Sequence, residues 1–291
     1  MIVESVEKNK PTQIVFHLGA HKTATSLIQK FLNNEEGFRK DNQIRHIDRT
    51  DSDTLIGLGD KLKKSPFVLR RRLLREGSYG SVGSTVILSH ENALGRPFSR
   101  ASGLYPKANG NAERLSKVAK HLPVKVIFYI RPLETFVPSY YMQSINEGGV
   151  LTFDSWLKKN IDLSKLSWTP VVQTIIDHFG IENVEIRDFR EIDAGNKIFL
   201  SNFFAACGLK SFTVPDYEKL HNPSLSEQGL KIALLVNPLL ENWTQRKSMR
   251  KFLQANFNNS NGEVPKLLTP ELREVLAGID AIEYESLLTR K

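Results

Sequence analysis

Short apolar runs alternate along this chain with stretches in which apolar residues recur at helical spacing. The apolar runs predict strands buried on both faces at 13–18, 86–88, 124–130 and 184–186. The helical spacing predicts helices over 26–32, 112–121, 133–145, 169–179 and 197–207. After residue 224 we expect two or three helical pieces, interrupted at Pro238, 258–262 and Pro265. This alternation predicts an α/β fold of three layers, with a central, mostly parallel sheet and a helical C-terminal part.

Length and composition favour one domain. The chain has 291 residues, of which 40% are hydrophobic and 25% charged, and these values exclude a disordered, collagen-like or coiled-coil protein. We expect 1–291 to form a single domain, with 35–110 as an insertion that forms the acceptor-binding region and 224–291 as its helical C-terminal part. The one cysteine, Cys207, lies in an apolar stretch and is predicted to be a buried, inert thiol.

The charge balance indicates an anionic partner. Forty Lys and Arg against 32 Asp and Glu give a net charge of +8, and the sequence pI is about 9.4. The electrostatic field of a protein with this positive charge attracts anions, which could be nucleic acid, an anionic membrane surface, a polyanionic glycan or a phosphorylated cofactor. No zinc-finger, recognition-helix or RNP-like pattern supports nucleic acid, and no apolar run is long enough for a membrane span. Since no signal-peptide pattern is found, we expect a cytoplasmic protein.

A loop of small and hydroxyl residues follows the first predicted strand, and its members are Gly19, Ala20, His21, Lys22, Thr23, Ala24, Thr25 and Ser26. A tight turn at the glycine, successive backbone N–H groups and the positive end of the next helix would together cradle an anion. The loop is not the nucleoside-triphosphate loop, because Ala24 stands where that motif needs its second glycine. The alternative is an ordinary strand-to-helix turn capped by Thr and Ser.

Two further polar clusters follow predicted strands and would share the same edge of a parallel sheet. Arg131 ends the strand 124–130, and with Ser139 in the next helix it could hold one phosphate. His90 and Glu91 follow the strand 86–88, and since neighbours in a strand point to opposite faces, only one of them is expected to face the site. His17 is predicted to be a core histidine, and no metal-binding constellation is visible in the sequence.

The segments 17–27 and 126–141 resemble the two cofactor signatures of sulfotransferases, and more loosely 187–189, 203–204 and 222–226 resemble bacterial members. That family has a P-loop-like α/β fold and uses 3′-phosphoadenosine 5′-phosphosulfate (PAPS). The resemblance implies transfer of a sulfuryl group from PAPS to a hydroxyl, which we expect on a carbohydrate. It also implies adenosine 3′,5′-bisphosphate (PAP) as the product and no metal.

The resemblance assigns roles to individual residues. Lys22 matches the lysine that contacts the phosphosulfate, and the rest of the loop 19–26 wraps it. Arg131 and Ser139 match the pair that holds the 3′-phosphate. Glu91 is favoured over His90 as the general base, because Ser-x-Glu is similar to the bacterial pattern.

The chain departs from the family pattern at two positions. Ala24 replaces a glycine, which requires that Ala24 keeps a negative φ. Pro138, directly before Ser139, must either kink the helix or lie in its first turn.

Other readings of the same residues remain open. A P-loop kinase or nucleotidase would use ATP and magnesium, and a non-catalytic module would bind a nucleotide or polyanion. The basic segment 61–75 is either a solvated helix face or a surface for an anionic acceptor, and its cations are Lys61, Lys63, Lys64, Arg70, Arg71, Arg72 and Arg75.

Overall fold

Five parallel strands form the central sheet of the computed structural model, which describes residues 13–48, 67, 70, 71, 73, 74, 84–217 and 223–290. Their order is β2-β3-β1-β6-β7. The bounds are β1 (Gln13–His17), β2 (Ile44–Ile47), β3 (Thr85–Ser89), β6 (Val124–Ile130) and β7 (Val184–Asp188). Because all neighbours pair in parallel, the carboxyl ends of all five strands lie at one edge of the sheet.

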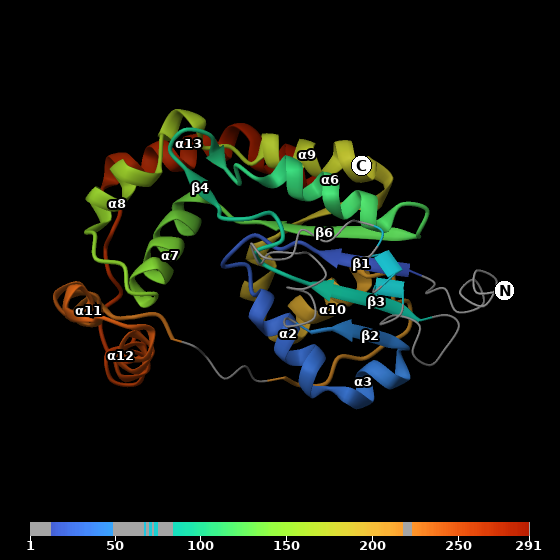
Figure 1. Cartoon of the computed structure of the whole chain (residues 1–291), viewed down its shortest axis with the longest axis horizontal. Coiled ribbons are helices and arrows are strands. Elements are labelled where there is room, and N and C mark those ends of the chain that lie inside the picture. Colours follow the sequence, from blue (N-terminus) through green and yellow to red (C-terminus); the bar gives the residue numbers. More distant parts are fainter. Residues whose placement is uncertain are drawn as a thin grey trace.

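Helices cover both faces of this sheet (Figure 1). One face carries α6 (Ala108–Ala119), α9 (Thr169–Phe179) and α13 (Pro270–Leu288), and the other carries α2 (Thr25–Asn34), α3 (Glu36–Asp41) and α10 (Asn196–Ala206). Alternation along β6 explains why both faces are apolar: Phe128 packs against Trp168 on the first face, and Tyr129 packs against Phe199 on the second. The predicted P-loop-like, three-layer α/β fold is therefore confirmed.

The remaining helices gather at one end of the molecule, at the left of Figure 1. They are α7 (Leu133–Asn146), α8 (Phe153–Asn160), α11 (Glu227–Val236) and α12 (Trp243–Asn256). Short elements complete the described chain: the antiparallel pair β4 (Phe98–Ser99) and β5 (Gly103–Leu104), and the 3₁₀ helices η1 (Leu163–Lys165), η2 (Ile181–Asn183), η3 (Phe189–Ala194) and η4 (Asn237–Leu239). Pro238 lies in η4, between two helices, as predicted.

The structure differs from the sequence prediction mainly in the segments between the strands that the sequence predicts. The pattern missed β2, because only Ile44 and Ile47 of its four residues are buried. It also missed α8, and it placed the start of α6 four residues late. Of the basic segment, Arg70 and Arg71 are described, and Lys61, Lys63, Lys64, Arg72 and Arg75 lie outside the described residues.

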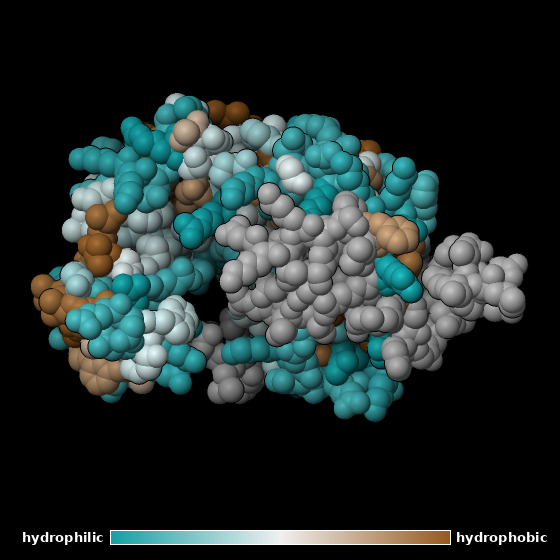
Figure 2. Space-filling view, viewed as in Figure 1, coloured by the Kyte–Doolittle hydropathy of each residue, from teal (hydrophilic) through white to brown (hydrophobic). Residues whose placement is uncertain are grey.

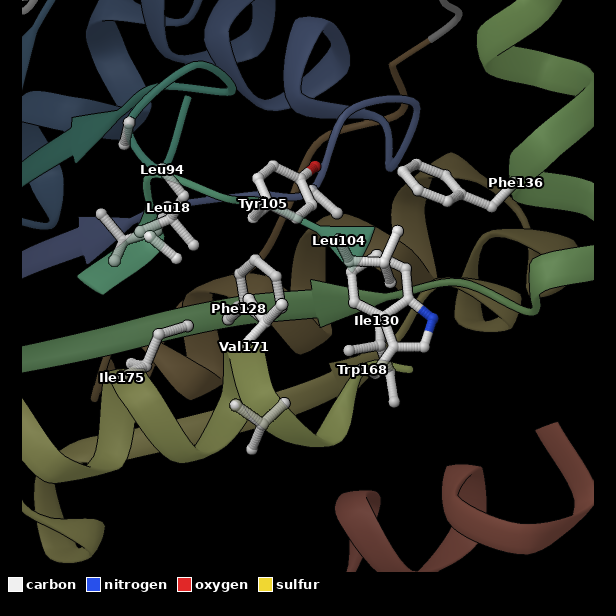
Figure 3. Close-up of a cluster of buried hydrophobic side chains, with 14 of the residues drawn as sticks. Leu18, Leu94, Leu104, Tyr105, Phe128, Ile130, Phe136, Trp168, Val171 and Ile175 are labelled. Atoms are coloured by element: carbon white, nitrogen blue, oxygen red, sulfur yellow. The ribbon is translucent and has the colours of Figure 1, made fainter. Parts of the chain in front are cut away.

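A buried aromatic cluster packs beside the carboxyl edge of the sheet (Figure 3). The fully buried Trp168 contacts the rings of Tyr105, Phe128 and Phe136, and its indole N–H donates to the Arg131 carbonyl at 3.0 Å. Figure 3 shows the ring of Tyr105 among these side chains, with its hydroxyl turned away from Phe128. The hydrogen bond from Trp168 therefore links the aromatic core to the backbone of Arg131 at the carboxyl edge of the sheet.

The single cysteine is buried, as predicted, and burial raises the pKa of its thiol. Among the helices that the structure describes, none combines the length and apolarity required to cross a bilayer.

Candidate functional site

The loop between β1 and α2 has two residues in the left-handed region. Lys22 has φ 63° and Ala24 has φ 59°, so the prediction that Ala24 keeps a negative φ is wrong. A non-glycine residue in this region costs about 1–2 kcal/mol, and it persists where surrounding contacts fix it. Here the Thr23 hydroxyl donates to the Ala20 carbonyl at 2.6 Å, and the Leu27 amide donates to the Ala24 carbonyl at 2.8 Å.

This backbone geometry suits an anion. Left-handed residues alternating with other conformations turn successive N–H groups toward one concavity. The N-cap residue of α2 is Ala24, whose side chain makes no capping hydrogen bond, so among the described residues the Thr25 and Ser26 amides at the start of the helix have no side-chain cap. Lys22 and Ser26 are exposed at the same loop. A cation, a hydroxyl and uncapped amides therefore meet there.

Gly19 lies between two buried polar atoms that have no hydrogen-bond partner. A Cβ at this position would lie 2.7 Å from Thr25 Oγ1 and 2.9 Å from His17 Nε2, so no side chain fits. Neither atom has a hydrogen-bond partner among the residues that the structure describes. Burial lowers the pKa of His17 to about 3, and its Nδ1 is 2.8 Å from Ser89 Oγ. His17 is thus the buried histidine that the sequence predicts, but it is satisfied at only one nitrogen.

His21 is held by side chains that follow other strands. Its Nε2 lies 2.7 Å from Asn92 Oδ1 and its Nδ1 lies 3.1 Å from the Tyr105 hydroxyl, which also accepts from the His21 amide at 2.8 Å. Burial lowers the pKa of His21, and the Glu91 carboxylate opposes that shift. Both ring nitrogens are engaged, so the side chain fixes the loop in place.

Arg131 joins the two segments that the sequence singled out. Its Nη1 donates to the Lys22 carbonyl at 2.7 Å and to Ser139 Oγ at 3.4 Å, and its Nε donates to Thr135 Oγ1 at 2.9 Å. The guanidinium lies 4.7 Å from the ring centre of Phe189. Burial lowers the pKa of Arg131 to about 10, which leaves it charged at neutral pH. Within the described chain no carboxylate forms an ion pair with it, and the Asp193 carboxylate acts on it only from beyond ion-pair distance.

The backbone around Arg131 is fixed by long-range contacts. The Asp280 carboxylate accepts from the Leu133 amide at 2.7 Å, and the Tyr284 hydroxyl donates to the Ile130 carbonyl at 3.1 Å. Pro138 is the sixth residue of α7, inside the helix and past its first turn. It supplies no N–H to the carbonyl one turn earlier, yet the next residue, Ser139, still reaches Arg131.

His90 and Glu91, which follow β3, differ in burial and in hydrogen bonding. His90 is buried, its Nδ1 accepts from the Asn92 amide at 3.1 Å, and its own amide donates to the His17 carbonyl at 2.9 Å. Glu91 is half-buried. Burial raises the pKa of Tyr140 and Tyr105, and the Glu91 carboxylate adds to both shifts.

The sequence reading missed several residues of this region. Tyr140 packs edge-on against His21 at 5.4 Å between ring centres, and after burial the Glu147 carboxylate is the next cause that raises the pKa of Tyr140. Gln143 donates to Glu147 at 2.9 Å. Adjacency to Glu91 could have indicated Asn92, whereas Tyr105 lies in a stretch without periodicity and had no local signal.

A search for metal ligands among the residues that the structure describes found no group of three or more His, Cys, Asp or Glu side chains able to hold an ion. The site therefore consists of an amide-lined loop, two cations and a half-buried carboxylate.

Comparisons with known proteins complete this description. No family model matches the chain, and no curated protein matches it. Among solved structures, the chain is similar to a sulfotransferase from Alicyclobacillus acidocaldarius, with 15% identity over 93% of this chain and 95% of that chain and a TM-score of 0.48. It is also similar to mouse sulfotransferase SULT7A1 complexed with PAP, with 11% identity over 97% and 88% and a TM-score of 0.43. Both are members of the family that the two sequence signatures resemble.

Proposed function

We propose that this chain is a PAPS-dependent sulfotransferase that moves a sulfuryl group to an acceptor hydroxyl. One observation carries the proposal: Arg131, a cation that forms no ion pair with any described carboxylate, donates to the carbonyl of Lys22 in the amide-lined loop. Two sites for anions therefore adjoin each other at the carboxyl edge of one sheet. A nucleotide with phosphate at both its 3′ and its 5′ position has the matching chemistry.

The residues present fit that cofactor. The loop amides with Lys22, Thr25 and Ser26 would hold the 5′-phosphosulfate, and Arg131 with Ser139 would hold the 3′-phosphate. Thr25 Oγ1 is buried without a partner, so it retains hydrogen-bonding capacity. PAPS supplies the activated sulfuryl group, and the protein's part is positioning and electrostatic stabilisation.

Lys22 and Glu91 have complementary tasks in this proposal. The Lys22 ammonium places positive charge where the departing nucleotide gains negative charge. The Glu91 carboxylate accepts the proton of the acceptor hydroxyl, a role typically worth ~10²–10⁴-fold in rate. His90 is the alternative base, and its burial and its bond from the Asn92 amide favour Glu91 over it.

The acceptor is proposed to be a carbohydrate or glycoconjugate, bound by the region 35–110 together with α7. After burial, the carboxylates of Glu147 and Glu91 both raise the pKa of the Tyr140 hydroxyl, so the three side chains lie in one region. Carboxylates accept hydrogen bonds from hydroxyl groups, and an aromatic ring adds a flat apolar surface. A hydroxyl-rich acceptor suits this combination.

Nucleotide binding tests the cofactor. PAP without magnesium should raise the unfolding temperature of the protein, and ATP with magnesium should not. The opposite result would favour the kinase reading and overturn the proposal. Stabilisation by PAP without sulfuryl transfer to any member of a broad acceptor panel would reduce the protein to a nucleotide-binding module.

A transfer assay with labelled PAPS tests the catalytic assignment. Lys22→Ala should abolish transfer to whichever acceptor the panel identifies. Lys30→Ala, which removes a cation from the middle of α2, should leave transfer unchanged.

A further inference from the structure

The end of the molecule formed by α11, η4 and α12 leaves large apolar side chains in solvent. The exposed fractions are 75% for Leu235, 74% for Leu239, 64% for Trp243 and 52% for Phe252. Figure 2 shows hydrophobic side chains gathered over α11 at this end, beside hydrophilic ones. Single exposed apolar side chains are common on protein surfaces, but a cluster of them marks an interaction surface.

The same end is strongly cationic. Helix α12 has the sequence WTQRKSMRKFLQAN, which contains four cations and no carboxylate. Trp243, Lys247 and Lys251 are spaced by four residues and share one stripe, whereas the buried Leu253 marks the inner face. Lys247 and Lys251 are exposed, and across the described part of the chain neither takes part in an ion pair.

Hydrogen bonds join this end of the molecule to α7, the helix that carries Ser139. The Asn237 side chain donates to the carbonyls of Ile145 at 2.9 Å and Gly149 at 2.8 Å, at the C-terminal end of α7. The Arg246 guanidinium turns inward and donates to the Leu240 carbonyl at 3.3 Å. Helix α7 also carries Ser139, so a partner bound at this end lies beside the site helix.

Three kinds of partner can be compared by charge and polarity. A second copy of this chain would cover the apolar side chains, but a two-fold contact would bring the cations of α12 against one another. A sulfated polymer would pair with the cations and leave Leu235, Leu239 and Trp243 in water. The surface of an anionic membrane satisfies both features, because basic and apolar side chains on one helix bind the headgroup region together.

We propose that the α11–α12 surface, defined as Leu235, Leu239, Trp243, Lys247 and Lys251, binds the surface of an anionic membrane. The apolar side chains enter the headgroup boundary, and the two lysines lie against lipid phosphate and carboxylate groups. This proposal does not depend on the proposed sulfotransferase activity.

Tryptophan fluorescence provides a direct test on the full-length protein. The chain has three tryptophans, of which Trp156 and Trp168 are buried and Trp243 is exposed. Vesicles of phosphatidylcholine with phosphatidylserine should shift the emission to shorter wavelength and sediment the protein. Vesicles of phosphatidylcholine alone should do neither, and added salt should weaken the binding.

Paired variants separate the electrostatic and apolar contributions. Lys247→Gln/Lys251→Gln should weaken vesicle binding about thirtyfold, since each lysine near an anionic surface contributes a factor of about five. The matched control, Lys120→Gln/Lys210→Gln, removes two exposed lysines that follow α6 and α10 and should bind as the unmodified chain does.

A second pair tests the apolar contact. Leu235→Ser/Leu239→Ser should weaken binding by about tenfold or more and keep Trp243 as the reporter. Val275→Ser/Ile282→Ser, which removes exposed apolar side chains from α13, should have no effect.

Three outcomes would overturn the membrane proposal. The first is equal binding to both kinds of vesicle. The second is unchanged vesicle binding in the Lys247→Gln/Lys251→Gln variant, and the third is the absence of an emission shift with either vesicle. Capture by heparin without vesicle binding would assign the surface to a polyanion. A dimer in light scattering that the Leu235→Ser/Leu239→Ser pair dissociates would assign it to a second copy.

Discussion

Replacing Arg131 tests whether its unpaired charge is the anion site. Nη1 and Nε are engaged with neutral oxygens, and across the described residues Nη2 has no hydrogen-bond partner. The two N–H groups of Nη2 are therefore the donors left for a phosphate. Arg131→Ala removes these donors and the charge, whereas Arg131→Lys keeps the charge and loses the planar fork.

The expected magnitudes follow from these contacts. A hydrogen bond to a charged group contributes about 1.5–3 kcal/mol, so Arg131→Ala should weaken PAP binding by about 3 kcal/mol, or roughly a hundredfold. Arg131→Lys should cost about 1.5 kcal/mol, or roughly tenfold. Stability should change little, by less than about 1 kcal/mol, because the lost bonds to neutral oxygens are offset by removal of a desolvated cation.

Calorimetric titration with PAP and urea unfolding without nucleotide measure the two quantities separately. Arg190→Ala is the matched control, because Arg190 is already paired with Asp188 at 2.6 Å and Glu285 at 2.8 Å. Its charge is compensated, so PAP affinity should stay within about twofold.

Two results would refute this reasoning. One is wild-type affinity for PAP in a folded Arg131→Ala protein. The other is an equal loss in Arg190→Ala, which would show that general positive charge, rather than the unpaired guanidinium, binds the nucleotide.

Three further substitutions give independent tests. Ala24→Gly should raise the free energy of unfolding by about 0.5–1 kcal/mol, because it relieves about 1–2 kcal/mol of left-handed strain, which exceeds the cost of the added chain entropy. The control is Ala20→Gly, at a position without positive φ, which should lower the free energy of unfolding. Glu91→Gln should reduce kcat by ~10²–10⁴-fold with PAP affinity unchanged, and full activity would move the base elsewhere. Burial raises the pKa of Asp280 to about 7, so this group's contribution to stability is present below pH 3.8 and is lost as the pH rises through 7. Asp280→Asn should flatten that dependence and gain about 1 kcal/mol at pH 8 after allowance for solvent screening, and an unchanged pH profile in urea unfolding would contradict this.

The sheet edge could be predicted from sequence because its signals are local. The three strands that carry the site, β1, β3 and β6, are contiguous apolar runs, and each polar cluster follows its strand directly. Lys22 and Arg131 are 109 residues apart in the chain, yet parallel pairing of β1 with β6 is enough to bring them together. The order of these strands in the sheet had to come from the structure.

Other features have no local signal. Ala24 is an ordinary residue in the sequence, and its left-handed backbone is imposed by the closed loop around it. Tyr105 lies in a stretch of turn residues, and its contact with His21 depends on where the β4–β5 pair places it. Strand β2 has too few buried residues for either periodicity to be visible.

The position of the Arg131 charge depends on the last helix of the chain. The residues on either side of it are tied to α13, Ile130 through the Tyr284 hydroxyl and Leu133 through the Asp280 carboxylate. These contacts span about 150 residues, and their α13 partners, Asp280 and Tyr284, lie outside every segment that resembles the family. A cation without a counterion is costly to hold beside the core, and a flexible arginine would turn to solvent instead. The long-range bonds from α13 therefore fix the backbone from which Arg131 reaches the loop.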